Sequence, residues 1–319
     1  MDELTIIPIN PAISAKTPMD PNVAAVVLTY NRLHLLKECI AALKGQTMPP
    51  RTIVVIDNGS GEDTKEWLAQ QTGITLITLK ENVGPAAGIK LGLKTAYEHG
   101  YQWMWVMDDD GLPHTMALEK MLTAKPGFVG AINSIVLDKD DKKTLAFKLH
   151  NYKTLDDITT SFVEDEIMPW NGTLFHREII QKVGYPREEL FLWGEEMEYY
   201  FRIKSIGGFP MFSVRDSWHF HPRNKGFFYR DVWDVKTNDR AYYFVRNKYP
   251  VYLSRHKRNK FKAFLHYLLF NTGMLYYILF YQKGNKGKKM KLVWAAAKDA
   301  LSADFTKKPA DVQVILKKL

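Results

Sequence analysis

The feature that most constrains the fold is an apolar run, Trp103 to Met107, that continues directly into the carboxylates Asp108, Asp109 and Asp110. Apolar residues favour burial, whereas an unpaired buried carboxylate is costly and shifts its pKa or finds a cation. The run therefore predicts a buried strand that ends at the edge of a cleft. Mg²⁺ and Mn²⁺ take oxygen ligands and often lie between carboxylates and substrate phosphates. A metal site is one interpretation of this stretch, and a solvated acidic turn is the other.

Composition describes a globular chain with one large domain or two interlocked domains. It has 319 residues, 46% hydrophobic and 13% aromatic, which is enough for a substantial core. Cys39 is the only cysteine, so no intrachain disulfide forms and nothing requires an oxidising compartment. Residues 1–22 contain prolines and no long apolar run. We expect an irregular arm there and not a secretory signal.

Strands alternate with helices through residues 23–127. Runs rich in apolar and β-branched residues at 23–30, 51–56 and 74–79 predict buried strands beside the run at 103–107. The stretches between them carry apolar residues at helical spacing. This alternation predicts βαβ units, and hence an α/β fold with a Rossmann-like, mostly parallel sheet flanked by helices.

Polar side chains follow the end of each predicted strand. In parallel sheets, ligands bind outside the carboxyl ends of the strands, so these side chains predict a ligand site. The sequence contains neither GxGxxG nor GxxxxGK[ST], which argues against a dinucleotide site or a P-loop. The polar ends are Thr29 to Arg32, Asp57-Asn58, Asn82 and Asp108 to Asp110.

Together with segments further along, these strand ends resemble the family 2 glycosyltransferases, which have the nucleotide-sugar-binding GT-A fold. The resemblance covers roughly residues 23–222. Residues 170–175 and 190–193 look closest to the bacterial galactofuranosyltransferase and rhamnosyltransferase branch. The ordered segments that carry the resemblance are Thr29–Arg32, Val55–Ser60, Asn82–Gly84, Met107–Asp110, Trp193–Glu198 and Trp218-His219.

The resemblance implies an inverting transfer of galactofuranose, rhamnose or another hexose from a UDP or dTDP sugar. The acceptor would be a glycan or lipid-linked glycan in cell-surface polysaccharide synthesis, with Mn²⁺ or Mg²⁺ on the diphosphate. The implied metal ligands are Asp108, Asp110 and His219, with His221 as the fallback; His219 could instead be a packed histidine. The implied nucleotide-sugar contacts are Thr29, Tyr30, Arg32, Asp57, Asn82, Asp108 and Asp109.

Inverting transfer also needs a general base for the acceptor hydroxyl. Glu196 matches that position of the family, where Asp is usual, and Glu195 is the alternative. On a helix, Glu195 and Glu198 share a face and Glu196 is rotated by about 100°, so we expect one of Glu195 and Glu196 to be structural. Trp170 and Trp193 are candidate platforms for the acceptor, with a core role equally open.

Basic charge is concentrated near the C-terminus. Residues 240–298 contain 14 Lys and Arg and no Asp or Glu, in a chain of net charge +9. The apolar run at 261–282 could span a bilayer by length, but Lys262 and His266 interrupt it, and basic clusters flank both ends. We therefore expect helices that bind an anionic membrane surface through 255–291. Packing within the protein or in a homo-oligomer is the next alternative, and a spanning helix the last.

These patterns divide the chain into an arm (1–22), a GT-A catalytic domain (23–250) and a basic amphipathic helical region (251–319). The catalytic domain comprises a nucleotide-sugar half (23–127) and an acceptor half (128–250). We expect a cytoplasmic protein at the inner face of the membrane. We expect no nucleic-acid partner, because the aromatic residues do not alternate with the charges. Competing hypotheses are a nucleotidyltransferase acting on sugar phosphates and a non-catalytic membrane-surface protein with this fold.

Overall fold

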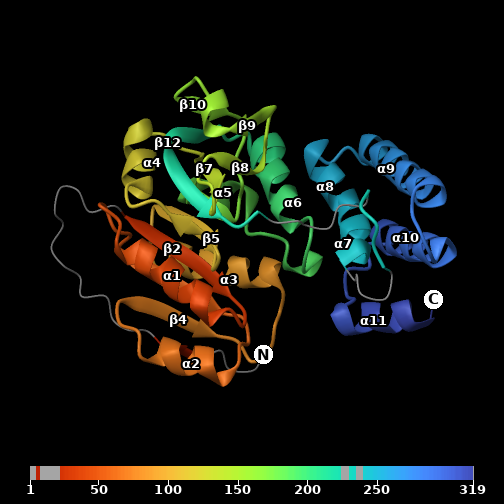
Figure 1. Cartoon of the computed structure of the whole chain (residues 1–319), viewed down its shortest axis with the longest axis horizontal. Helices are drawn as coiled ribbons and strands as arrows, with labels where there is room; N and C mark the ends of the chain where they lie inside the picture. Colours follow the sequence, from red (N-terminus) through yellow and green to blue (C-terminus); the bar gives the residue numbers. More distant parts are fainter. Residues whose placement is uncertain (1–4, 8–21, 224–229, 235–239, 319) are drawn as a thin grey trace. The chain divides into compact units, whose positions relative to one another are not determined.

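The computed structural model describes residues 5–7, 22–223, 230–234 and 240–318. The chain divides into two compact units (Figure 1). Unit 1 comprises residues 1–185 and 207–224, and unit 2 comprises residues 186–206 and 225–319.

The first half of unit 1 confirms the predicted alternation of strands and helices. Its four central strands are parallel, in the order β4-β3-β2-β5. Strands β2, β3 and β5 are rich in apolar residues and are buried on both faces, as expected for the middle of such a sheet. Strand β4 is partly exposed at Thr75 and Thr78. The elements are β2 (Val23–Thr29), α1 (Leu33–Lys44), β3 (Thr52–Asp57), α2 (Glu62–Ala69), β4 (Ile74–Thr78), α3 (Pro85–Glu98) and β5 (Trp103–Asp108).

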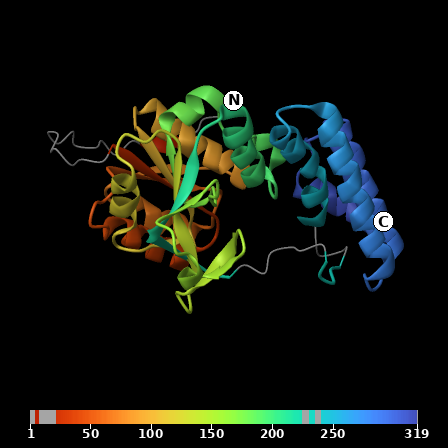
Figure 2. The same ribbon diagram turned by 90° about the horizontal axis from the view of Figure 1, so that it is seen from above.

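Helices cover both faces of this sheet (Figure 2). Leu36 and Ile40 of α1 join one apolar cluster with Val27 of β2. Helix α3 packs on the opposite face, where Gly88 and Gly92 let its backbone approach the sheet. A Cβ added at Gly92 would lie 2.4 Å from Val26 Cγ1. The two glycines of α3 therefore allow the helix to pack closely on the sheet.

The second half of unit 1 corrects the prediction of a mostly parallel sheet, because the sheet is mixed. Strand β11 (Asn171–His176) runs antiparallel between β5 and β7 (Ala131–Asp138). Strand β12 (Met211–His221) is parallel to β7. The remaining elements are β6 (Leu112–Pro113), α4 (Ala117–Ala124), β8 (Thr144–Leu149), β9 (Tyr152–Thr154), η1 (Leu155–Asp157), β10 (Phe162–Glu164) and α5 (Arg177–Val183).

The predicted irregular arm also needs correction. Residues Thr5–Ile7 form strand β1, which pairs antiparallel with β4. These residues are β-branched, and an edge strand offers unpaired backbone groups for such a segment. The rest of the arm, residues 1–4 and 8–21, lies outside the described residues.

Unit 2 is helical, and its composition corrects the predicted boundary at residue 250. Residues 186–206 and helix α7 belong with the C-terminal helices and not with the sheet. One reason is that Ser254 donates a hydrogen bond to Glu198 at 2.8 Å. The elements are η2 (Glu188–Leu190), α6 (Glu195–Phe201), the π-helical turn η3 (Arg202–Gly207), α7 (Arg240–Arg246), α8 (Lys248–Arg255), α9 (Lys260–Phe280), α10 (Lys286–Leu301) and α11 (Pro309–Lys318).

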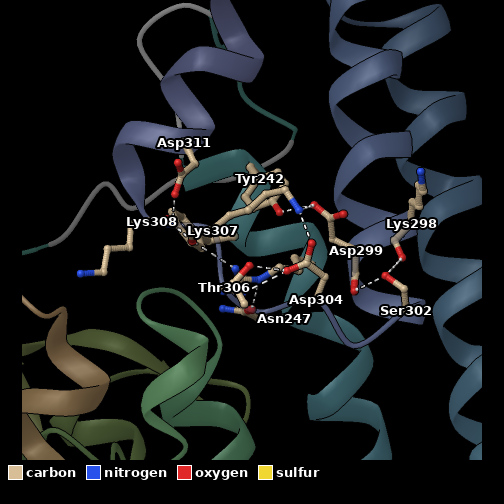
Figure 3. Close-up of polar contacts among 12 residues, drawn as sticks. Tyr242, Asn247, Lys298, Asp299, Ser302, Asp304, Thr306, Lys307, Lys308 and Asp311 are labelled. Atoms are coloured by element: carbon tan, nitrogen blue, oxygen red, sulfur yellow. Dashed lines mark hydrogen bonds and ion pairs between the residues drawn. The ribbon is translucent and has the colours of Figure 1, made fainter.

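A polar network ties α7 and α10 to the segment before α11 (Figure 3). The hydroxyl of Tyr242 donates to the carboxylate of Asp299. Lys307 pairs with Asp299 at 2.9 Å and also with Asp304. Around it, Trp233, Tyr243, Met274 and Leu292 contribute to one apolar core. Unit 2 thus has its own core and its own buried polar contacts.

Candidate active site

The three carboxylates stand at the carboxyl end of β5, as predicted. Asp108 is the last residue of the strand, and the chain turns at once, since the amide of Gly111 donates to the Asp108 carbonyl at 3.2 Å. Asp109 is 3% exposed. Its carboxylate accepts a 2.7 Å hydrogen bond from the hydroxyl of Thr29, at the end of neighbouring β2. Two predicted site residues, from different strands, are therefore in direct contact.

Arg32 links two of the carboxylates. Its Nη1 lies 3.2 Å from Asp109 Oδ1 and 3.0 Å from Asp110 Oδ2. The arginine side chain remains 51% exposed, so its remaining donors can reach a ligand. Tyr30, also predicted here, is 44% exposed. A half-exposed guanidinium beside carboxylates suits recognition of a phosphate group.

His221 completes this cluster. Its Nε2 lies 3.1 Å from Asp110 Oδ1, and its Nδ1 donates to the Pro222 carbonyl at 2.7 Å. Burial opposes ionisation of both partners, but their mutual contact outweighs it. The contact between His221 and Asp110 raises the pKa of His221. Together with the charge of Arg32, the same contact holds the pKa of Asp110 below its usual value. For Asp109, burial prevails and raises the pKa. Two adjacent aspartates thus have different electrostatic environments.

His219, the predicted ligand, occupies a tighter place. It is fully buried, and a Cβ at either Gly111 or Gly172 would collide with its ring. Among the described residues, neither ring nitrogen has a hydrogen-bond partner. Burial and the charge of His221 lower the pKa of His219 to about 3, against the pull of Asp110. His221, the alternative metal ligand from the sequence analysis, is the histidine that contacts Asp110.

A second group of polar residues lies after β3. Asp57 is fully buried, and its Oδ1 accepts from the Ser60 amide at 2.9 Å. Its Oδ2 has no partner among the described residues. Asn58 donates to Asn82 Oδ1 at 3.1 Å and accepts from the Val83 amide at 2.9 Å. Asn58 therefore fixes the predicted contact residue Asn82, a role that the sequence pattern did not assign to it.

The donor set fits a metal that is shared with a substrate. Within the described ranges, no group of three His, Cys, Asp or Glu side chains is arranged to hold an ion. Mg²⁺ and Mn²⁺ commonly use one or two carboxylates and complete their shell with water and phosphate oxygens. Asp110 and His221 supply adjacent oxygen and nitrogen donors, and the bond from His221 Nδ1 fixes the ring as metal-binding histidines require.

The mixed sheet flanked by helices is a GT-A-like fold, and these polar side chains lie at the carboxyl ends of its parallel strands, where α/β sheets bind ligands. The chain belongs to glycosyl transferase family 2, because residues 24–184 match that family. The prediction from the ordered sequence segments is confirmed.

Two relatives and one solved structure illustrate the similarity. Galactofuranosyltransferase GlfT1 of Mycolicibacterium smegmatis is 29% identical over 214 residues, 63% of this chain and 70% of the relative. The dTDP-rhamnosyl transferase RfbF of Shigella flexneri is 26% identical over 201 residues, 59% of this chain and 65% of the relative. The mannosyltransferase PcManGT of Pyrobaculum calidifontis, in complex with GDP-Man and Mn²⁺, matches with TM-score 0.51 and 16% identity, over 99% of this chain and 83% of that chain.

The predicted base residues belong to unit 2. Glu198 forms a buried pair with Arg202 at 2.9 Å and accepts the bond from Ser254, so it is structural. Glu195 is 5% exposed, whereas Glu196 is half-buried. The three glutamates of this helix therefore differ in burial, and Glu196 is the least buried of them.

The two predicted tryptophan platforms have different surroundings. Trp170, in unit 1, is 3% exposed, with its ring centre 6.1 Å from that of Phe175. Its ring faces are covered by protein in this conformation. Trp193, in unit 2, is partly buried and contacts Phe244 edge-on. Only Trp193 retains surface that an acceptor could meet.

Proposed function

We propose that the protein is an inverting, metal-dependent hexosyltransferase. The observation that carries the proposal is the convergence of Thr29, Arg32 and His221 on the adjacent carboxylates Asp109 and Asp110, at the end of a parallel strand. The names of the relatives support galactofuranose, or rhamnose carried by dTDP, as the donor sugar, and UDP is the other nucleotide that we propose. The acceptor would be a glycan or lipid-linked glycan at the inner face of the cell membrane.

In this proposal the donor lies across the carboxyl ends of β2, β3 and β5. The Oδ2 of Asp57, which has no hydrogen-bond partner within the described part of the chain, accepts a hydrogen bond from the base or ribose, and Asn82 lines the nucleotide. Arg32 turns its exposed donors to the diphosphate. Asp108, Asp110 and a histidine would hold the divalent metal, and His221 is favoured over His219 because it contacts Asp110. When bound, the metal neutralises negative charge on the departing diphosphate.

The general base in this proposal is Glu196. It takes the proton from the acceptor hydroxyl as that oxygen attacks the anomeric carbon. Two observations support it over its neighbours: Glu195 is buried, and Glu198 is committed to Arg202. Trp193 is the better-supported acceptor platform, because Trp170 is buried.

The test is release of nucleoside diphosphate from a panel of UDP and dTDP sugars, with Mn²⁺, Mg²⁺ or EDTA. We expect release with one donor, dependent on metal, and faster when a glycan acceptor is present. Pyrophosphate release from a nucleoside triphosphate and a sugar phosphate would instead identify a nucleotidyltransferase. No turnover across the panel, with no donor binding by calorimetry, would overturn the proposal in favour of a non-catalytic protein.

A further inference from the structure

Helix α9 has two contrasting faces. Its inner face is buried within unit 2 through Ala263, Tyr267, Asn271, Met274 and Ile278, which recur at helical spacing. Its outer face is apolar and open to solvent along the whole helix. The exposed residues are Phe261, Phe264, Leu265, Leu268, Leu269, Tyr276, Leu279 and Phe280, with Leu269 and Phe261 each 71% exposed.

After Lys260 and Lys262 in its first turn, α9 has no further acidic residue, lysine or arginine. Between Lys262 and Lys283 the sequence contains no Asp, Glu, Lys or Arg. The uncharged part of the helix, residues 263–280, is therefore about 27 Å long. Exposed apolar surface that is this continuous marks an interaction site, whereas scattered exposed apolar residues do not.

The basic charge at the two ends of α9 favours an anionic lipid surface over a second copy of the chain as the binding partner. Arg255, Lys257, Arg258, Lys260 and Lys262 lie at its start, and Lys283, Lys286, Lys288 and Lys291 follow its end. A second copy of the chain, parallel or antiparallel, would bring basic ends together, and residues 240–298 contain no acidic residue to offset them. An anionic lipid surface instead attracts both ends at once, because each basic residue near the headgroups adds to the attraction.

The contacts of the inner face indicate whether α9 crosses the bilayer or lies along its surface. By length and composition α9 could cross a bilayer, and 28% of its most apolar stretch is buried. However, Tyr267 donates to the Val245 carbonyl at 3.1 Å, and His266 stacks on Tyr252 with ring centres 4.0 Å apart. Insertion across the membrane would require these contacts with α7 and α8 to break. A helix that lies along the interface keeps them.

We propose that the outer face of α9 binds lengthwise to an anionic lipid bilayer, with the basic clusters at its two ends on the headgroups. The neighbouring helix α10 adds a residue outside the predicted 255–291 segment, because Trp294 is 71% exposed. Tryptophan favours the interface between headgroups and acyl chains. This inference is independent of sugar transfer, since its test has no turnover readout.

The first experiment is sedimentation of the full chain with vesicles of phosphatidylcholine containing phosphatidylserine, and with phosphatidylcholine alone. We expect binding to the anionic vesicles that weakens with salt. Two double variants test the two contributions: Phe261→Gln with Leu269→Gln, and Lys262→Glu with Lys283→Glu. Each should weaken binding about tenfold or more. Matched changes elsewhere, Val314→Gln and Lys94→Glu, should not. Circular dichroism confirms that each variant is folded.

The second experiment measures how deeply three positions of α9 enter the bilayer. Phe261→Cys, Leu269→Cys and Phe280→Cys are labelled separately with a fluorophore, since native Cys39 is fully buried, and quenched by brominated lipids. A helix along the interface gives the same shallow depth at all three positions, whereas a spanning helix places position 269 deepest. Deep quenching at 269 alone, absence of vesicle binding, or a dimer in solution that the Phe261/Leu269 variant abolishes would each overturn the proposal.

Discussion

At the scale of single residues, Asn247 holds the loop that precedes α6. It is fully buried, and its Nδ2 donates to the carbonyls of Leu190, Leu192 and Trp193 at 2.8–2.9 Å. Phe191 and Trp193 adopt positive φ of 62° and 61°, which is unfavourable for such side chains unless the surroundings impose it. The backbone conformation of the loop before Glu196, the predicted base, thus depends on the side-chain amide of Asn247.

We predict that Asn247→Ala lowers the free energy of unfolding by about 2–4 kcal/mol, because buried carbonyls lose their donor. Urea unfolding measures this loss. Transfer should slow while donor binding, which rests on unit 1, is unchanged. The exposed Asn151→Ala should change stability by less than about 0.5 kcal/mol. Equal stability of the two variants would contradict the role given to Asn247.

The base assignment is tested by Glu196→Gln, which keeps the size of the side chain and removes its basicity. We expect kcat to fall by about 10² to 10⁴, with donor affinity unchanged by calorimetry. Glu195→Gln is the comparison that separates the neighbours. If Glu195→Gln loses turnover and Glu196→Gln keeps it, the base is Glu195.

At the scale of elements, two helical glycines have opposite surroundings. Gly92 of α3 lies against Val26 and Ile56, whereas nothing lies within 4 Å of a Cβ built on Gly273 of α9. Sequence alone gives both the same helix penalty. Only the packing of α3 on the sheet makes Gly92 necessary.

We therefore predict that Gly92→Ala destabilises unit 1 by about 1 kcal/mol, since overpacking of about 1–3 kcal/mol exceeds the gain in helix propensity. In contrast, Gly273→Ala should stabilise unit 2 by about 0.5–1 kcal/mol. Chemical unfolding of both variants provides the comparison. A stabilising Gly92→Ala would show that α3 does not approach the sheet this closely.

At the scale of the whole molecule, the acid sensitivity of unit 2 follows from its polar network (Figure 3). Hydrogen bonds from Lys307 and Thr306 hold the pKa of Asp304 well below its usual value. Its stabilisation is therefore present above the unfolded pKa of about 4 and is lost as pH falls further. Because Asp304 is partly exposed, we expect a loss of no more than about 1 kcal/mol.

Thermal unfolding at pH 7 and pH 3 checks this prediction. Asp304→Asn should lower the stability at pH 7 and reduce the difference between the two pH values. The exposed Asp216 provides a matched control, since Asp216→Asn removes a carboxylate from unit 1 and leaves the polar network of unit 2 intact. An unchanged pH dependence in Asp304→Asn would assign the acid sensitivity to other carboxylates.

Much of unit 1 was predictable because its signals are local. Buried strands have continuous apolar runs, and helices have a period of 3.6 residues. Because parallel strands end at one edge of the sheet, these patterns were enough to place Thr29, Asp57 and Asp108 at that edge. The choice between His219 and His221 did not follow, because residues two apart on β12 share a face. Only the pairing of β12 with β6, which places His219 opposite Pro113, accompanies the contact of His221 with Asp110 and the position of His219 between Gly111 and Gly172.

By itself, the sequence determined the strand–helix alternation, the family and the basic, apolar character of the C-terminal helices, because each depends on neighbours along the chain. The tertiary structure decided the mixed sheet, the membership of residues 186–206 in unit 2 and the face of α9 that stays open. These depend on contacts between segments far apart in sequence, such as Asn247 with Trp193 and Tyr267 with Val245. No local pattern specifies such contacts, since each needs both partners already in place.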